Sequence, residues 1–194
     1  CTPNHKILRF NTTKKTRQEL KLEEIQHFPG QAVVVRSAGS WNGSEIDTVH
    51  APYLPNRRWK GKQQPEALSI QQFSGLVGWM ITEGSLVRRD NAIAICQIDP
   101  TKKRRCKELL DGCGFTQKWN GKNVLIYSHE WLSKFEWLTH ASTKRIPHWL
   151  KQVKREALES LICAMVDGDG HWEKRDDPDD RSGEYYTSSG ELAS

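Results

Sequence analysis

The chain has 194 residues and a formal net charge of +5, which allows one or two domains with a real core and favours an anionic partner. No apolar run approaches the roughly 20 residues that a membrane-spanning helix needs, and the N-terminus shows no signal peptide. Five cysteines without a Cys-x-x-Cys pair indicate reduced intracellular thiols and argue against a disulfide framework or a zinc site.

The first third of the chain is predicted to be extended or irregular. The segments "KILRF" and "AVVVR" favour short strands, with a turn at "FPGQ" between them. From residue 37 to 65 the chain is rich in Gly, Pro, Asn, Ser and Trp and includes the basic aromatic loop "NRRWKGK". We therefore expect an all-β segment over residues 1–45 and a linker over 46–67.

From residue 68 the pattern becomes helical. Apolar residues at three- and four-residue spacing predict a helix that ends at Gly84: Ile70, Phe73, Leu76, Val77, Met80 and Ile81. Two short strands follow, "SLVRRD" and "AIAICQI". A basic helix then begins with Asp99 as N-cap and Pro100 in its first turn.

The next segment predicts a hairpin whose two-residue turn is Asn120-Gly121. "HEWLSKFEWL" predicts another helix, and "KRIPHWLKQ" leads into a helix that contains "LICAMVDGDG". Charge is uneven along the chain. Residues 51–125 carry 13 Lys and Arg against 6 Asp and Glu, whereas residues 166–194 carry 3 against 9, which suggests an anion-binding surface beside a site that demands cations.

A unit made of an apolar helix, an acid and a glycine occurs twice. "LVGWMITEG" ends with Glu83 and Gly84, and "ICAMVDGDG" ends with Asp169 and Gly170, each pair 86 positions apart. Two short strands and a helix start follow each unit; the second helix start, "SSGELA", fits a capping box. The sequence therefore predicts an α+β fold of two αββα-type repeats about a pseudo-twofold axis.

Small residues line one face of each acid-bearing helix, so the two helices can pack closely. The two seams comprise Gly75, Gly78 and Thr82 on the first helix and Ser160, Ala164 and Gly168 on the second. Close packing would bring Glu83 and Asp169 together at the helix C-termini. The two carboxylates repel each other there, and the helix dipoles add partial negative charge, so we expect divalent cations to be needed for the site to be stable. Hard oxygen ligands suit Mg²⁺, and metals held by paired carboxylates are typical of phosphodiester cleavage.

The two nonapeptides resemble the paired motifs of LAGLIDADG homing endonucleases. The resemblance to this family covers about residues 68–194 of the chain. Asp167, Asp169 and Gly170 fall on the D, D and G of the second motif, and "KRIP" resembles the block that precedes it in intein endonucleases. The resemblance implies a site-specific double-stranded DNA endonuclease, monomeric with internal pseudo-twofold symmetry, that acts on a long asymmetric target. Its metals, Mg²⁺ or Mn²⁺, would be held by Glu83, Gly84, Asp169 and Gly170, with Glu83, Asp169 and Lys144 catalytic. Asp167 is expected at the helix end or behind the site.

DNA contacts are expected from the strands that follow each motif and from the basic helix. The candidates are Arg88, Arg89, Gln97, Lys102, Lys103, Arg104, Arg105, Lys118 and Lys122. For any one basic cluster a solvated surface is an equally good interpretation.

The N-terminal "TPNH" resembles the T-x-x-H block of the Hint splicing domain of inteins, with Thr2 and His5 as its polar residues. The residues that complete a splicing site are missing, and the second repeat stops at its first helix after the hairpin. The resemblance therefore implies an internal piece of an intein, with a partial Hint segment before a truncated second repeat, that does not splice by itself. Two alternatives stay open: a LAGLIDADG-type DNA-binding protein that has lost cleavage, and a splicing module with a decayed nuclease.

Overall fold

The computed structural model describes residues 6–11, 16–21, 33–34, 43–53, 64–138, 144–173, 183–187, 189 and 192. Thr2, His5, the "NRRWKGK" loop and most of the second "SSGELA" helix start lie outside the described residues. The chain divides into two compact units, Cys1–Trp41 and Asn42–Ala193. None of the helices that the described residues form is long and apolar enough to cross a membrane.

The first unit contains a three-stranded antiparallel sheet in the order β2-β1-β3. Its strands are β1 (Lys6–Asn11), β2 (Thr16–Lys21) and β3 (Val33–Val34). The strand expected at "KILRF" is confirmed, and within "AVVVR" the described residues Val33 and Val34 form a strand, the rest of that segment lying outside the described residues. The sequence did not predict β2, because "TRQELK" holds a single apolar residue and so shows no alternation.

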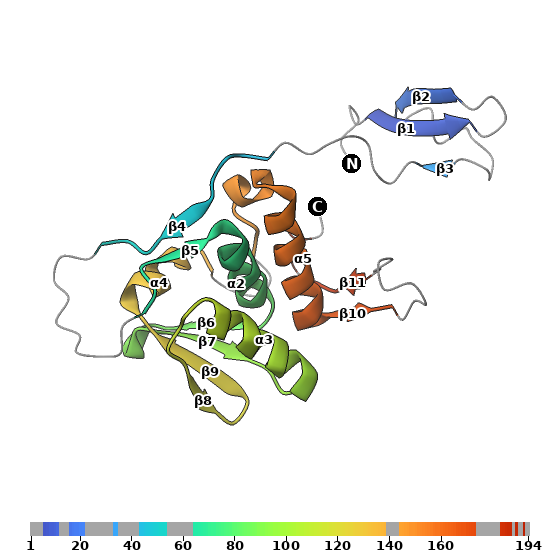
Figure 1. Cartoon of the computed structure of the whole chain (residues 1–194). Helices are drawn as coiled ribbons and strands as arrows, with labels where there is room; N and C mark the ends of the chain where they lie inside the picture. The colour runs from blue at the N-terminus through green and yellow to red at the C-terminus, as the bar shows by residue number, and fades with distance from the viewer. Residues whose placement is uncertain are drawn as a thin grey trace. The chain divides into compact units, whose positions relative to one another are not determined.

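The second unit has an α+β architecture in which helices lie beside a small antiparallel sheet (Figure 1). Its elements are β4 (Thr48–His50), β5 (Ala67–Ser69), α2 (Ile70–Thr82), β6 (Gly84–Val87), η1 (Arg88–Asp90), β7 (Ala92–Cys96), α3 (Pro100–Gly112), β8 (Lys118–Asn120), β9 (Asn123–Tyr127), α4 (His129–Lys134), η3 (His148–Gln152), α5 (Arg155–Asp169), β10 (Gly170–Trp172) and β11 (Gly183–Tyr185).

Side-chain caps define where α2 and α3 begin. Ser69 and Gln72 form a capping box, in which the Ser69 hydroxyl accepts from the Gln72 backbone and the Gln72 side chain accepts from the Ser69 backbone. The Asp99 carboxylate caps α3 by accepting from the backbone N–H groups of Thr101 and Lys102. The predicted start of α3, with Pro100 at its first position, is confirmed.

The main sheet has the order β6-β7-β9-β8. One of its faces buries Ile93, Ile95, Val124 and Ile126 in the core with α2. Asn120 pairs with Asn123, so the hairpin turn is Gly121-Lys122, one residue later than predicted. Gly121 has φ +57, which fits a turn type that requires glycine at its first central position.

Part of the predicted linker belongs to the second unit. Thr48–His50 pairs antiparallel with Ala67–Ser69, and the Ile70 N–H donates to the Asp47 carbonyl. This short ladder leads directly into α2. The boundary between the compact units falls at Trp41, earlier than the expected end of the first segment.

The repeated order of helix, strand and strand is present in the second unit. α2 leads into the β6-β7 pair, and α5 leads into the β10-β11 pair. Gly84 begins β6 opposite Ile95, as Gly170 begins β10 opposite Tyr185. The two acids therefore occupy equivalent places, each between an apolar helix and the strand that follows it.

Candidate active site at two helix ends

The two acid-bearing helices, α2 and α5, pack side by side (Figure 1). A Cβ added at Gly78 would lie 2.6 Å from the Ala164 Cβ and 2.6 Å from the Leu161 carbonyl oxygen. A Cβ added at Gly168 would overlap the Thr82 side chain. The predicted seam is therefore confirmed at Gly78, Thr82, Ala164 and Gly168.

Gly75 lies outside that seam, contrary to the prediction. An added Cβ there would lie 3.2 Å from the Leu109 Cδ1 on α3. Gly75 precedes Gly78 by three residues, which turns it about 60° around the helix, enough to face α3 instead of α5. Because Gly75 has no side chain, Leu109 of the first repeat packs directly against this turn of α2.

Close packing places Glu83 and Asp169 at neighbouring helix ends. Glu83 is the C-cap residue of α2, and Asp169 is the last residue of α5. Burial raises the pKa of Glu83 above its ordinary value, and the negative charge of Asp169 raises it further. Burial also raises the pKa of Asp169, against the lowering effect of Lys144 and Lys102. The partly buried Glu83 carboxylate and the more exposed Asp169 carboxylate thus share one region, as the sequence predicted.

Two lysines cap the same helix ends in matching positions. Lys102 donates through Nζ to the Gly168 and Gly170 carbonyls at 2.8 and 3.3 Å. Lys144 donates through Nζ to the Thr82 and Gly84 carbonyls at 3.2 and 3.4 Å. The two carbonyl pairs are 86 positions apart in the chain, like the acids. Each acid therefore has a helix-end ammonium group beside it.

The Lys144 side chain is buried, with the residue 9% exposed. Burial lowers its pKa, whereas the charges of Asp169 and Glu83 raise it. The sequence placed Lys144 near the acids on its resemblance alone, and the geometry agrees with that position. Lys102 was expected to meet DNA phosphate, but the described structure directs its ammonium group to the helix ends.

The donor atoms at this site suit a hard divalent cation. Among the residues that the structure describes, none donates a hydrogen bond to the Asp169 carboxylate, and Glu83 accepts one from Gln97. The Gly84 and Gly170 carbonyls already accept from the lysines, although each carbonyl oxygen has a second lone pair. Carboxylate and carbonyl oxygens are the ligands that Mg²⁺ prefers. Glu83 and Asp169 therefore fit a metal, with the carbonyls less accessible than expected.

The lysines also change the expected charge balance. The sequence suggested that the paired acids are stable only with divalent cations. The structure places two ammonium groups beside two carboxylates, so the chain supplies compensating charge itself. Within the described part of the chain, no three His, Cys, Asp or Glu side chains come together as a metal cluster.

Gln97 is a site residue whose role the sequence did not indicate. It is only 6% exposed, and its Nε2 donates to Glu83 Oε1 at 3.1 Å. Its Oε1 accepts from the backbone N–H groups of Ile98 and Asp99, both at 3.0 Å. These two donors fix which end of the amide faces Glu83. Gln97 is thus turned inward, away from the DNA-reading position that we expected for it.

Asp167 stands behind the acid pair, as expected. It pairs with Arg105 of α3 and accepts a hydrogen bond from the Trp172 indole N–H at 2.7 Å. These contacts join α3, α5 and β10. Arg105, a predicted DNA contact, is therefore engaged within the protein.

The remaining predicted DNA contacts are distributed over both ends of the sheet. Arg88 and Arg89 are exposed in the turn between β6 and β7, and Lys118 and Lys122 are exposed in the β8-β9 hairpin. Lys103 donates to the Gly121 carbonyl at 2.6 Å and lies 4.9 Å from the Trp119 ring centre. Arg104 is exposed and pairs weakly with Glu108.

The sheet face opposite the core is mostly uncharged. Alternation along the strands places Ala92, Ala94, Leu125 and Tyr127 on that face. Lys118 pairs opposite Leu125 at its edge. Hydrogen bonds to base edges would therefore come from few residues of the described strands.

Two cavities lie near these elements. One of about 380 Å³ adjoins the site and is lined by Asp169, Lys144, Tyr185 and Thr187 among others. Burial raises the pKa of Tyr185, and the neighbouring charge of Asp169 adds to this shift. This cavity gives one side of the acid pair room for a ligand group.

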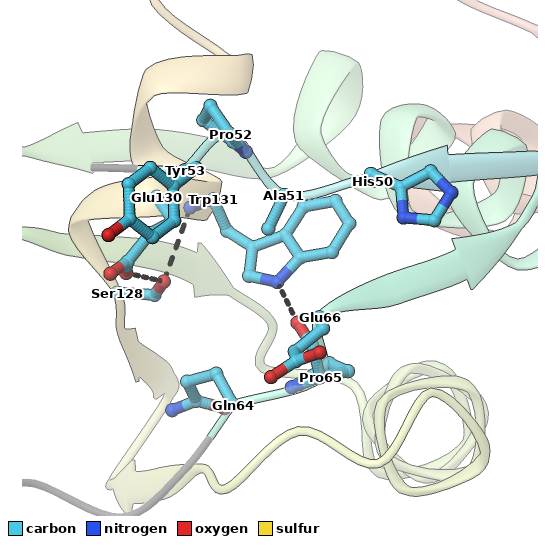
Figure 2. Close-up of a pocket in the computed structure, with 10 residues that line it drawn as sticks. All are labelled: His50, Ala51, Pro52, Tyr53, Gln64, Pro65, Glu66, Ser128, Glu130 and Trp131. Carbon is cyan, nitrogen blue, oxygen red and sulfur yellow. Dashed lines mark hydrogen bonds between the residues drawn. The ribbon is translucent and has the colours of Figure 1, made fainter. Parts of the chain in front are cut away.

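The other cavity, of about 510 Å³, lies at α4 (Figure 2). There the Trp131 indole donates to the Pro65 carbonyl at 2.8 Å, and the Ser128 hydroxyl donates to Glu130 at 3.0 Å. Ser128 also caps α4 by accepting from the Trp131 backbone. The Ser128 hydroxyl thus caps the start of α4, and the Trp131 indole anchors this helix to the Pro65 carbonyl.

No protein-family model matches the chain, and no curated protein matches it. Among solved structures it is similar to the crystal structure of the N-terminal LAGLIDADG domain of DUF199/WhiA, with 12% sequence identity and a TM-score of 0.36. The match covers 53% of this chain and 50% of that one, so the chain spans about half the length of that relative. A likeness this distant establishes neither a family nor an activity.

Proposed function

We propose that this chain is a metal-dependent endonuclease that cleaves double-stranded DNA, with the architecture of a LAGLIDADG homing endonuclease. One observation carries the proposal. Glu83 and Asp169 lie at the adjacent ends of two close-packed, repeat-related helices, and Lys102 and Lys144 lie beside them. Paired acids with flanking cations suit a reaction at a phosphodiester.

In this proposal Glu83 and Asp169 hold Mg²⁺ or Mn²⁺, and the Gly84 and Gly170 carbonyls are further candidate ligands. The bound metal supplies Lewis acidity and an activated water. Lys144, and Lys102 with it, bind and orient the scissile phosphate by offering positive charge at the helix ends. Gln97 holds the Glu83 carboxylate in one orientation.

DNA binding falls to the exposed cations outside this centre. Arg88, Arg89, Lys118 and Lys122 lie at the two ends of the sheet, where they meet the sugar-phosphate backbone. Contacts of this kind bind without sequence preference and weaken as salt rises. The target would be a long asymmetric duplex, because the two repeats differ in their surface residues.

We also propose that the chain derives from an intein. This finer assignment depends on the "TPNH" block with Thr2 and His5, and on the order of an all-β segment before the repeats. Expressing the chain between flanking protein segments and looking for a joined product by mass spectrometry tests splicing separately from cleavage. A joined product would support the intein assignment.

A second candidate is a DNA-binding relative that does not cleave. The observation in its favour is that Lys102 and Lys144 balance the carboxylates without a metal. A protein that binds DNA through its cations and keeps the acids only as structure would show this arrangement.

Selection from randomised duplexes followed by a cleavage assay separates the two candidates. The selected duplexes are incubated with Mg²⁺, with Mn²⁺ and with chelator, using wild type, Asp169→Asn and the exposed control Asp111→Asn. The nuclease proposal expects metal-dependent cleavage by wild type and the control but not by Asp169→Asn. Binding without cleavage under every metal condition supports the second candidate, and no enrichment of any duplex contradicts both.

A further inference from the structure

A third cavity, of about 700 Å³, lies near the opposite end of α2 from the acid pair. Phe73, which lines it, precedes Glu83 by ten residues, or about 15 Å along a helix. The other lining residues include Trp137 and Trp149 and the cations Lys134, Arg145 and Lys151. Nothing in the proposed DNA cleavage uses this cavity.

The aromatic side chains that line this cavity, Phe73, Trp137 and Trp149, are held by contacts within the protein. Trp149 stacks on Phe73 with ring centres 5.9 Å apart and an interplanar angle of 20°. Phe73 in turn stacks on the buried Phe135 at 5.8 Å. The Trp137 indole is held by a 2.8 Å hydrogen bond to the Lys134 carbonyl. Trp149 nevertheless remains 40% exposed, so an ordered indole is available to a ligand.

The charge around this aromatic wall has one sign. No carboxylate is among the residues that line the cavity. Of the ion pairs formed within the described ranges, none involves Lys134, Arg145 or Lys151, whereas Arg104, Lys107, Lys154 and Arg155 each pair with an acid. Three cations that pair with no acid of the described residues therefore surround an aromatic surface.

The segment that carries these groups also carries Lys144. Lys144 directs its ammonium group to the carbonyls at the C-terminal end of α2, and its neighbour Arg145 lines the cavity. Trp149 follows four residues later in η3. One short stretch of chain thus contributes side chains both to the cavity and to the separate site of the acid pair.

We propose that this cavity binds a nucleotide, with its base stacked on Trp149 and its phosphate among Lys134, Arg145 and Lys151. The volume lies within the range of about 300 to 1,000 Å³ typical of small-molecule sites. Stacking on an aromatic side chain tolerates any base, and the surrounding cations select for phosphate. The nucleotide could be a free mononucleotide or an unpaired nucleotide of a single strand, which share this chemistry.

Calorimetric titration of the whole chain with AMP, adenosine and ribose 5-phosphate tests both halves of the proposal. We expect AMP to bind about tenfold or more tightly than either fragment. Trp149→Ala and the pair Arg145→Ala with Lys151→Ala should each weaken AMP by a similar factor. Trp149→Phe should retain most of the affinity, and Arg104→Ala and Asp169→Asn should leave it unchanged.

A labelled single-stranded oligothymidine distinguishes the two sources of nucleotide. Binding of AMP alone assigns the cavity to free nucleotides, and binding of both probes, each weakened by Trp149→Ala, assigns it to single strands. Thermal unfolding of each variant identifies any that has not folded, in which case Trp149→Phe and Arg104→Ala remain as the comparison. The proposal is wrong if inorganic phosphate competes as well as AMP, if the Trp149 variants bind like wild type, or if no probe binds.

Discussion

Gln97 donates a hydrogen bond from Nε2 to Oε1 of Glu83, and its own Oε1 is held by two backbone N–H groups at the start of α3. Gln97, which directly follows the C-terminal end of β7, therefore orients the carboxylate of Glu83. The bond also lowers the pKa of Glu83, against the larger effect of burial.

Gln97→Glu should destabilise the protein at neutral pH. One oxygen of the new carboxylate would accept from the Ile98 and Asp99 N–H groups, and the other would face Glu83 without a proton between them. Lost hydrogen bonds to a charged group and added repulsion should cost about 1.5 to 3 kcal/mol. Chemical denaturation at pH 7 and pH 5 measures this cost, which should shrink at the lower pH. The exposed control Gln152→Glu should change little. An equal loss in both variants would show that a new carboxylate costs the same at either position, so that the pairing of Gln97 with Glu83 does not matter.

Asp169→Asn should raise stability and flatten its dependence on pH. The folded-state pKa values of Glu83 and Asp169 are raised, so the native state holds protons that the unfolded state releases first. Stability then falls as pH rises from about 4, where unfolded carboxylates titrate, through the folded pKa values. Lys144, whose pKa burial lowers from 10.5, contributes in the opposite direction between its lowered folded-state pKa and 10.5.

Denaturant titrations of wild type and Asp169→Asn between pH 4 and pH 8 measure this difference. The two proteins should be closest in stability at the acid end and diverge as pH rises. A parallel pair of curves would mean that Asp169 carries no unfavourable charge in the folded protein. Asp111→Asn is the matched control, because Asp111 is exposed and its pKa is lowered by Lys107.

The sequence was a good guide where one local pattern decides the outcome. Helix periodicity, the Asp99 cap and the repeated acid-glycine ending placed α2, α3 and the acid pair correctly. The pairing of Glu83 with Asp169 needed only the assumption that small residues mark a helix interface. Gly78 and Gly168 satisfy that assumption.

The residues that the sequence misplaced are polar side chains whose partners lie far along the chain. Lys102 contacts Gly168, 66 positions away, and Gln97 lies next to Cys96, whose N–H donates to the Glu83 carbonyl and so brings the Gln97 side chain to Glu83. In the sequence both residues belong to an ordinary polar stretch. A charge run is usually a solvated surface, so tertiary packing alone distinguishes the inward lysine from its outward neighbours.

Gly78→Ala tests the helix seam. The added methyl group would meet Ala164 Cβ and the Leu161 carbonyl at 2.6 Å, so α2 and α5 must separate, at a cost of about 1 to 3 kcal/mol. Separation would also move the two acids apart. Gly112→Ala provides the control, because an added Cβ there meets nothing within 4 Å and the change should be neutral or slightly stabilising. Equal unfolding midpoints for the two variants would place the interface elsewhere.

Lys102→Met tests whether the lysines and a metal neutralise the same charge. Removing this ammonium leaves the Gly168 and Gly170 carbonyls without their donor and the carboxylates with one cation fewer. Without metal the variant should melt below wild type, by about 2 to 4 °C for each kcal/mol lost in a protein of this size. Mg²⁺ or Mn²⁺ should then raise its midpoint more than that of wild type, because a metal replaces the missing charge and meets less competition at the carbonyls. Lys103→Met is the matched control, since Lys103 contacts Gly121 and Trp119 instead of the helix ends. If the metal raises the unfolding midpoints of wild type, Lys102→Met and Lys103→Met by the same amount, the Lys102 ammonium group and the metal do not neutralise the same charge. The negative charge of Glu83 and Asp169 would then be balanced in another way.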